Sequence, residues 1–256
     1  MEGMLEGKIA VITGAGQGLG KAIAKAFAKE KAGVALSDVN EAAIEEVVEE
    51  IISDGGKAVA VKADVAKREQ TEKLMRKSAE EFGTIDILVN NAGIVRDSMI
   101  HKMTEQQWDQ VLAVHAKGTF NCIQAVSSFM MRKKTGHNGS SGGRIINVTS
   151  GAGLEGNMGQ VNYSAAKAAI IGITKTVARE WGRYGVCVNA IAPLADTPMT
   201  SGIPGEMLKV LLKRVPLGRM GDPEEDIAPV AVFLASEMAR YITGQVICAD
   251  GGTVML

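Results

Sequence analysis

The chain has 256 residues, of which 46% are hydrophobic, and its 28 basic and 29 acidic side chains leave a formal net charge of −1. This length suits one large α/β domain or two small ones, and the near-neutral charge excludes the basic field that nucleic-acid binding requires. No uninterrupted apolar run approaches 18 residues and the start of the chain lacks a signal-peptide pattern, so we expect a cytoplasmic protein without a membrane span.

Short β-rich runs alternate with helical patterns along the whole chain. The predicted strands cover residues 8–13, 33–38, 57–64, 86–93, 143–150, 186–193 and 245–250. The predicted helices cover residues 18–30, 40–54, 67–82, 104–131, 160–182, 205–214 and 223–237. Strands that are apolar on both faces and alternate with helices predict a parallel sheet covered by helices on both sides.

We therefore expect an α/β fold with one domain over residues 1–256: a Rossmann-like, doubly wound sheet of seven strands in the order 3-2-1-4-5-6-7. Residues 133–143 are polar and rich in glycine and serine, and predict a surface loop between a helix and a strand rather than a linker between domains.

A glycine-rich turn follows the first predicted strand and opens the first predicted helix. Its sequence, TGAGQGLG, spaces Gly14, Gly18 and Gly20 as T-G-x-x-x-G-x-G rather than as the tighter G-x-G-x-x-G. Glycine lets the backbone approach a ligand closely, and the amino terminus of the helix offers free N–H groups to a pyrophosphate. A plain strand–helix turn is the alternative interpretation.

Asp38 ends the second predicted strand. In a dinucleotide-binding fold this position faces the adenosine ribose, where a carboxylate accepts hydrogen bonds from both hydroxyls and repels a 2′-phosphate. Gln17, Val39 and Asn40 carry no positive charge, so the sequence favours NAD over NADP as the cofactor. The alternative role for Asp38 is to cap the following helix.

Tyr163 and Lys167 are four residues apart in a predicted helix and therefore lie on one face of it. At about 5 Å and an effective dielectric of roughly 20, the lysine charge favours a tyrosinate by about 3 kcal/mol and is expected to lower the tyrosine pKa. Such a group takes the hydroxyl proton of an alcohol while a hydride leaves its carbon. Ser150 ends the fifth predicted strand, where its hydroxyl can hold the substrate oxygen. An exposed helix pair is the alternative for Tyr163 and Lys167.

Together these motifs resemble the short-chain dehydrogenase/reductase family over essentially the whole chain. The likeness comprises TGAGQGLG (13–20), DV (64–65), NNAG (90–93), Ser150, YSAAK (163–167), VNAIAP (188–193) and ADGG (249–252). It implies that Ser150, Tyr163 and Lys167 are catalytic. It also implies a set of cofactor-binding residues that includes Tyr163, Lys167 and Asp38. The glycine turn contributes Gly14, Gln17, Gly18, Leu19 and Gly20. Asp64 and Val65 would line the adenine, Asn91 to Gly93 would border the cofactor, and Thr197 would contact the nicotinamide carboxamide.

His115 lies in the apolar segment QVLAVHAKGTF, where the family usually carries an asparagine that helps to hold a water against the catalytic lysine. A histidine also donates and accepts hydrogen bonds, so the resemblance implies a relay role for His115. The alternative is that His115 pins a bend in its helix. The three histidines and three cysteines show no metal-ligand spacing, so we expect no metal. A cationic Lys167 nearby predicts a neutral His115 at pH 7.

The histidine, the run TSGAGLEGNMGQVNYSAAK and the short loop APLADT resemble the hydroxyacyl-CoA dehydrogenase part of multifunctional β-oxidation enzymes, and β-ketoacyl-ACP reductases are also similar. The leading expectation is an NAD-dependent enzyme that interconverts a 3-hydroxyacyl-CoA and its 3-oxo form. The alternatives are a 3-oxoacyl-ACP reductase, whose usual NADPH does not suit Asp38, a sugar or steroid alcohol dehydrogenase, and, from another class, a catalytically silent NAD-binding subunit.

Residues 194–220 contain several methionines, prolines and glycines and lie after a strand end. We expect this segment to act as a lid over an elongated, partly apolar substrate, and the alternative is that its methionines pack the core. The family resemblance also implies a homotetramer formed through the helices near 104–131 and 160–182, with Trp181 close to the interface.

Overall fold

The computed structural model describes residues 3–131 and 142–255, so most of the loop expected at 133–143 lies outside the described residues. Seven parallel strands form one sheet in the order β3-β2-β1-β4-β5-β6-β7, which confirms the predicted order. The strands are β1 (Ile9–Thr13), β2 (Gly33–Ser37), β3 (Lys57–Ala60), β4 (Ile87–Asn90), β5 (Arg144–Val148), β6 (Cys187–Pro193) and β7 (Val246–Ala249).

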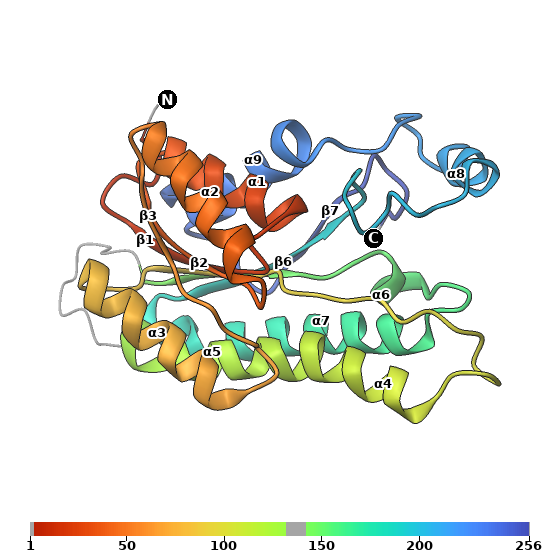
Figure 1. The fold of residues 1–256 in the computed structure, drawn as a ribbon, viewed down its shortest axis with the longest axis horizontal. Helices are drawn as coiled ribbons and strands as arrows, with labels where there is room; N and C mark the ends of the chain where they lie inside the picture. Colours follow the sequence, from red (N-terminus) through yellow and green to blue (C-terminus); the bar gives the residue numbers. More distant parts are fainter. Residues whose placement is uncertain (1–2, 132–141, 256) are drawn as a thin grey trace.

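Helices cover both faces of this sheet. They are α1 (Gly18–Lys29), α2 (Glu41–Ser53), α3 (Arg68–Phe82), α4 (Glu105–Leu112), α5 (Gly118–Met130), α6 (Ala152–Glu155), α7 (Val161–Trp181), α8 (Gly205–Leu212) and α9 (Ala228–Ala235). Short turns of other helical types are η1 (Ala113–Lys117), η2 (Gly182–Tyr184), η3 (Pro223–Ile227) and η4 (Glu237–Ala239). Helices α1, α2 and α9 lie on one face, and α3, α5 and α7 lie on the other (Figure 1).

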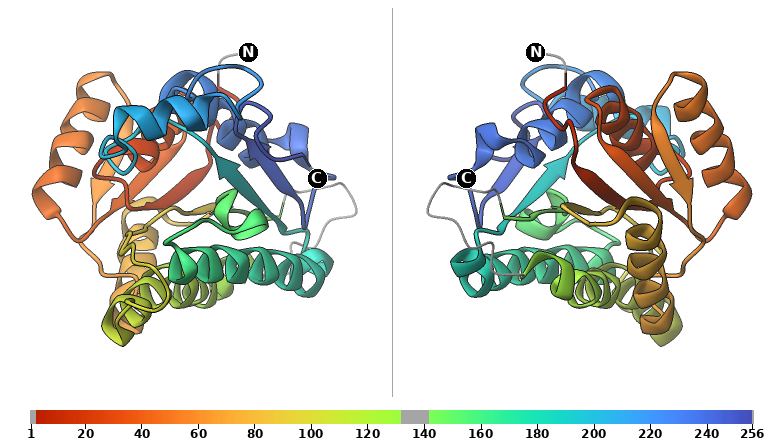
Figure 2. Two further views of the ribbon diagram at one scale, coloured as in Figure 1. Left: turned by 90° about the vertical axis from the view of Figure 1, so that its right-hand side faces the viewer. Right: turned by 90° about the vertical axis from the view of Figure 1, so that its left-hand side faces the viewer.

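Helices lie on both faces of the sheet (Figure 2). The strands are buried on both sides, and their side chains form two hydrophobic cores, one on each face. In β1, Ile12 packs with Phe27 of α1 and Ile44 of α2, whereas its neighbour Val11 packs on the other side with Leu74 of α3. Successive side chains of a strand point to opposite faces, which is why β1 reads as a continuous apolar run.

Several strands end earlier than the sequence predicts. β3 ends at Ala60 rather than residue 64, β4 at Asn90 rather than 93, and β5 at Val148 rather than 150. The residues beyond these ends leave the sheet at its carboxyl edge, where ligands bind in open α/β sheets. The shorter strands therefore leave the expected site residues in connecting segments.

The predicted helix over 104–131 contains a π-helical turn, η1, which separates α4 from α5 and has His115 at its centre. Such single turns often lie at functional sites. The short helix α6 was not predicted at all.

Trp181 at the end of α7 is only 7% exposed and packs within the core beside α3 and α5. The Trp181 ring is therefore covered by its own chain, and a subunit interface close to it stays a prediction. Trp108 and Phe120 of α4 and α5 remain exposed at 38% and 49%.

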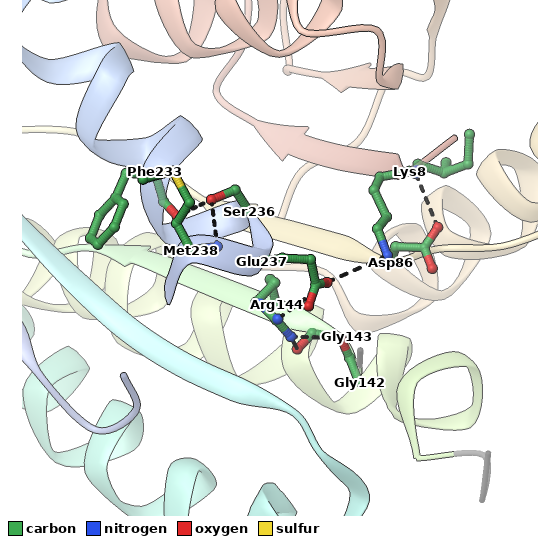
Figure 3. Close-up of polar contacts among 10 residues, drawn as sticks. Lys8, Asp86, Gly142, Gly143, Arg144, Phe233, Ser236, Glu237 and Met238 are labelled. Atoms are coloured by element: carbon green, nitrogen blue, oxygen red, sulfur yellow. Dashed lines mark hydrogen bonds and ion pairs between the residues drawn. The ribbon is translucent and has the colours of Figure 1, made fainter. Parts of the chain in front are cut away.

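Lys8, Arg144 and Glu237 form a charged cluster at the amino edge of the sheet (Figure 3). Glu237 lies 3.8 Å from Lys8, which precedes β1, and 3.5 Å from the buried Arg144 at the start of β5. Arg144 also donates to the carbonyls of Gly142 and Gly143. These contacts join three segments of the chain and account for the burial of this arginine.

Among the described residues, no helix is both long and apolar enough to cross a bilayer.

Candidate active site

Two cavities, of about 600 Å³ and 320 Å³, lie at the carboxyl edge of the sheet. The larger one is lined by all four residues expected in catalysis: His115, Ser150, Tyr163 and Lys167. The smaller one is lined by the expected cofactor residues Gly14, Gln17, Gly18, Leu19, Asp38, Asp64, Val65, Asn91, Gly93 and Thr197. Leu19, Asn91, Gly93 and Thr197 line both cavities, so the two spaces adjoin.

The glycine turn between β1 and α1 depends on the absence of side chains. Gly14 and Gly18 have φ angles of +64° and +54°, which other residues rarely adopt. A Cβ on Gly20, which does not line either cavity, would lie 2.1 Å from the Gly14 carbonyl oxygen, so Gly20 serves the packing of the turn. Helix α1 begins after Gln17 with no side-chain cap, which leaves N–H groups available to an anion.

Asn91 and Thr13 fix the position of this turn. The Asn91 amide donates to the carbonyls of Thr13 and Gly14 at 3.0 and 2.9 Å. The Thr13 hydroxyl accepts from the backbone N–H groups of Asn91 and Ala92 and donates to the Val89 carbonyl. The sequence patterns predict Asn91 only as a cofactor-binding residue and give no separate role to Thr13. Their position at the adjacent ends of β1 and β4 is the signal that could have identified them.

Asp38 follows β2 and lines the smaller cavity. Its carboxylate accepts from the backbone N–H groups of Gly16 at 3.3 Å and Asn40 at 3.1 Å. Helix α2 is instead capped by Asn40, whose side chain accepts from the N–H of Ala43. The alternative role of Asp38 as the helix cap is therefore wrong. No lysine or arginine of the described chain lines this cavity.

The wall expected to face the adenine is also held by a side chain that the sequence analysis missed. The Asn121 amide of α5 donates to the Val65 carbonyl at 2.8 Å. Asp64 accepts from the N–H of Ala66 at 3.0 Å. The Asn121 bond ties the segment after β3 to α5, and the Asp64 bond fixes the turn within that segment.

Tyr163 and Lys167 share one face of α7, and the Lys167 ammonium lies 5.4 Å from the centre of the tyrosine ring. Lys167 is 3% exposed and donates to the Val148 carbonyl at 2.7 Å. Burial lowers the pKa of Lys167 to about 7, because removal from water disfavours the charged ammonium. This lysine can therefore gain or lose a proton near neutral pH.

The predicted lowering of the Tyr163 pKa is wrong for the protein without ligands. Burial, reinforced by the negative charge of Asp97, raises the pKa of Tyr163 to about 12, and a hydrogen bond with Ser150 opposes the rise. The predicted lowering would need a fully charged Lys167 and a solvated phenol, whereas both groups are buried. With its own pKa near 7, Lys167 carries only about half a charge at that pH.

His115 is almost fully buried, and its ring lies between Tyr163 and the segment after β4. Its Nε2 atom lies 2.8 Å from the Ile94 carbonyl oxygen and 3.1 Å from the Ile94 nitrogen, while Nδ1 has no partner within the described structure. Burial and the charge of Lys167 lower the pKa of His115 to about 3, which confirms that it is neutral at pH 7. A Cβ on Gly93 would lie 2.4 Å from the imidazole, so this glycine makes room for the ring.

Asn162 is a further positioning residue that the sequence analysis did not identify. Its side-chain oxygen accepts from the N–H of Tyr163 at 2.7 Å, and its amide donates to the carbonyls of Arg96 and Gln107. The start of α7 is thereby tied to α4 and to the segment after β4. The buried amide immediately before the tyrosine was the available signal.

Comparison with known proteins agrees with this geometry. A sequence profile of the family described as enoyl-(acyl carrier protein) reductase matches residues 14–254. The chain belongs to the short-chain dehydrogenase/reductase family. This short-chain dehydrogenase/reductase is therefore an oxidoreductase rather than a silent subunit, and its family uses a nicotinamide cofactor.

The 3-oxoacyl-[acyl-carrier-protein] reductase FabG of Thermotoga maritima is 44% identical over 98% of this chain and 99% of its own length. The protein of the same name from Staphylococcus epidermidis is 42% identical over 97% of this chain and 99% of its own length. A 3-oxoacyl-[acyl-carrier-protein] reductase of Synechocystis is 44% identical over 98% of each chain. The similarity thus covers the residues that line both cavities and the segment 194–220.

The residues present suit a nicotinamide dinucleotide. The uncapped amino terminus of α1 suits its pyrophosphate, and the Asp38 carboxylate suits a ribose with free hydroxyls. The larger cavity, which Tyr163 lines, adjoins this smaller cavity at Gly93 and Thr197. Within the described residues, no group of three potential ligands gathers to hold a metal ion.

Proposed function

We propose that this enzyme interconverts a 3-oxoacyl thioester and the corresponding 3-hydroxyacyl thioester with NAD(H). The observation that carries the proposal is that Ser150, Tyr163 and Lys167 line the larger cavity together, with the Lys167 ammonium 5.4 Å from the tyrosine ring centre, and that this cavity adjoins the one lined by Asp38. The names of the relatives favour a thioester on acyl carrier protein over the CoA thioester that the sequence analysis placed first.

In this proposal Ser150 and Tyr163 both contact the oxygen of the substrate. Ser150 donates a hydrogen bond that holds the carbonyl, and Tyr163 gives its proton to the same oxygen as the carbon is reduced. When bound, reduced nicotinamide supplies the hydride. Lys167 lies beside Tyr163 and, with a pKa of about 7, can return a proton to the tyrosine after each turnover.

The direction of the pKa values suits reduction. A pKa of about 12 keeps Tyr163 protonated at neutral pH, as a proton donor must be before the reaction. Oxidation of the alcohol needs the tyrosinate instead, which the positive charge of oxidised nicotinamide would favour. We therefore propose that reduction of the 3-oxo group is the more rapid direction near pH 7.

The preference for NAD(H) rests on Asp38. A carboxylate at this position repels a 2′-phosphate, and no basic side chain of the described residues lines the same cavity to offset that repulsion. In this respect the chain departs from the NADPH use that its resemblance to 3-oxoacyl-ACP reductases implies. The cofactor can therefore be tested separately from the substrate.

The lid segment supports a substrate with an apolar part. Met199, Ile203, Met207 and Leu211 line the larger cavity. Met199 and Met207 are 46% and 64% exposed, so the alternative that these two methionines pack the core is wrong. An acyl chain would cover this apolar surface, whereas a sugar would leave it in water.

The test is a comparison of NADH oxidation with 3-oxobutanoyl-ACP, 3-oxobutanoyl-CoA, a ketose and a 3-oxosteroid, all at one pH. The proposal expects turnover with the thioesters and a higher kcat/KM for the ACP form. Turnover of the ketose or the steroid alone would contradict it.

We further propose a homotetramer, supported by the exposed Trp108 and Phe120 on α4 and α5. Light scattering at micromolar concentration should give four times the mass of one chain. A monomer would contradict this proposal without affecting the one on chemistry.

A further inference from the structure

Arg214 is an exposed cation in the lining of the larger cavity. It lies two residues after the last residue of α8 and lines the larger cavity together with Met207 and Leu211. Its side chain is 64% exposed, so it lies where the cavity meets solvent. Its guanidinium Nη2 lies 3.4 Å from a carboxylate oxygen of Glu155, at the end of α6.

The charges that line the larger cavity are unevenly distributed. Its basic side chains are Lys167 and Arg214. Lys167 is buried at the reacting end and directs its ammonium to the Val148 carbonyl. Arg214 is consequently the cation available at the solvent end.

The other carboxylates of the cavity have partners of their own. Asp97 accepts from the side chain of Gln160 at 2.9 Å. Asp250 is 6% exposed and accepts from the N–H groups of Gly252 and Val254. Only Glu155 opposes Arg214, and an exposed pair of this length is weak. Most of the five N–H donors of the guanidinium are therefore free to bind an incoming anion.

We infer that Arg214 binds the phosphate of the pantetheine arm of the thioester substrate. The inference rests on the proposed function, because CoA and acyl carrier protein both present their acyl group on a phosphopantetheine arm. With the carbonyl at Tyr163, the arm leaves the cavity between α6 and the lid and carries its phosphate toward Arg214. A guanidinium binds phosphate oxygens in a bidentate manner, which a lysine cannot reproduce.

Glu155 has a defined part in this arrangement. It competes with the phosphate for the guanidinium and adds a like charge beside the anion. Removal of the Glu155 charge should therefore improve the binding of a phosphorylated substrate, whereas removal of the Arg214 charge should weaken it. The two substitutions are expected to act in opposite directions.

Two substrates that differ in one group test the inference: 3-oxobutanoyl-pantetheine and 3-oxobutanoyl-4′-phosphopantetheine. The measured quantity is the ratio of their kcat/KM values, phosphorylated over unphosphorylated, with NADH saturating. Arg214→Gln should lower this ratio by roughly tenfold, the effect of one hydrogen bond to a charged group. Glu155→Gln should raise it.

Lys209→Gln is the matched control. Lys209 is a cation of α8, the helix that precedes Arg214; it pairs with Glu206 at 2.8 Å and does not line the cavity. This variant should leave the ratio at the wild-type value. An equal effect of Lys209→Gln and Arg214→Gln would mean that the phosphate responds to the total positive charge of this segment and not to contact with Arg214. That result would overturn the inference.

The remaining outcomes are also decisive. Equal loss on both substrates in Arg214→Gln would mean that the arginine only holds the lid, which overturns the inference but leaves the proposed function intact. Absence of turnover with every thioester in the wild type would overturn both. Parallel assays with 3-oxobutanoyl-CoA and 3-oxobutanoyl-ACP distinguish the source of the phosphate. The kcat/KM of Arg214→Gln should fall with the substrate whose phosphate Arg214 binds.

Discussion

His115 packs edge-on against Tyr163, with the two ring centres 5.2 Å apart and the ring planes at 90°. The Nε2 atom of the imidazole lies within hydrogen-bond distance of the Ile94 backbone. The segment after β4, the π-helical turn and Tyr163 are therefore in contact through the His115 side chain. This contact leaves both a relay role and a positioning role open for His115, and kinetics can separate them.

Substitution of His115 should reveal its role. His115→Asn should keep much of the activity, because an amide also offers a donor and an acceptor, and His115→Leu should lower kcat by about 10²-fold. The melting temperature of both variants is measured alongside kcat. A lower melting temperature with unchanged kcat in His115→Leu would show that the residue only supports the fold.

The sequence predicts the frame of this site well. The glycine turn, Asp38 and the Tyr163–Lys167 pair are local patterns whose placement follows from strand order alone. The break of the long helix at His115 could not be predicted in this way, because the apolar period continues through it. The pKa of Tyr163 escaped prediction for a different reason: it depends on burial by distant segments, which no spacing in the sequence reports.

Asp38 should determine the cofactor preference. Wild-type enzyme is expected to have a higher kcat/KM with NADH than with NADPH, and Asp38→Ala should lower that ratio roughly tenfold by removing a hydrogen bond to a charged group. Initial rates with both cofactors at one fixed substrate concentration measure the ratio. A wild-type preference for NADPH would refute this assignment.

The buried Lys167 should make stability depend on pH. Its pKa is about 7 in the folded protein and about 10.4 when unfolded, so the unfolded chain binds more protons between these values and stability rises with pH. From pH 7 to pH 9 this contributes about 2 kcal/mol. Urea unfolding of wild type and Lys167→Met at one protein concentration measures the difference. An identical pH dependence in the two proteins would show that Lys167 has an ordinary pKa.

The lid should become better protected when the site fills. Thr197 and Pro198 lie against Gly18 of the glycine turn, and Met207 lines the larger cavity, so we expect both the cofactor and the substrate to contact this segment. Trypsin cleavage after Lys209, Lys213 and Arg214 is expected to slow with cofactor alone and to slow further with cofactor and substrate. Equal cleavage under all three conditions would favour a lid that is already fixed.

The most direct test of the account is the rate of NADH oxidation with a 3-oxoacyl thioester in wild type and in Tyr163→Phe. The variant keeps the aromatic ring against His115 and removes only the hydroxyl that gives the proton. We predict turnover by the wild type and a loss of kcat of about 10²- to 10⁴-fold in the variant, with cofactor binding retained. Absence of turnover in the wild type, or a variant as active as the wild type, would contradict the account.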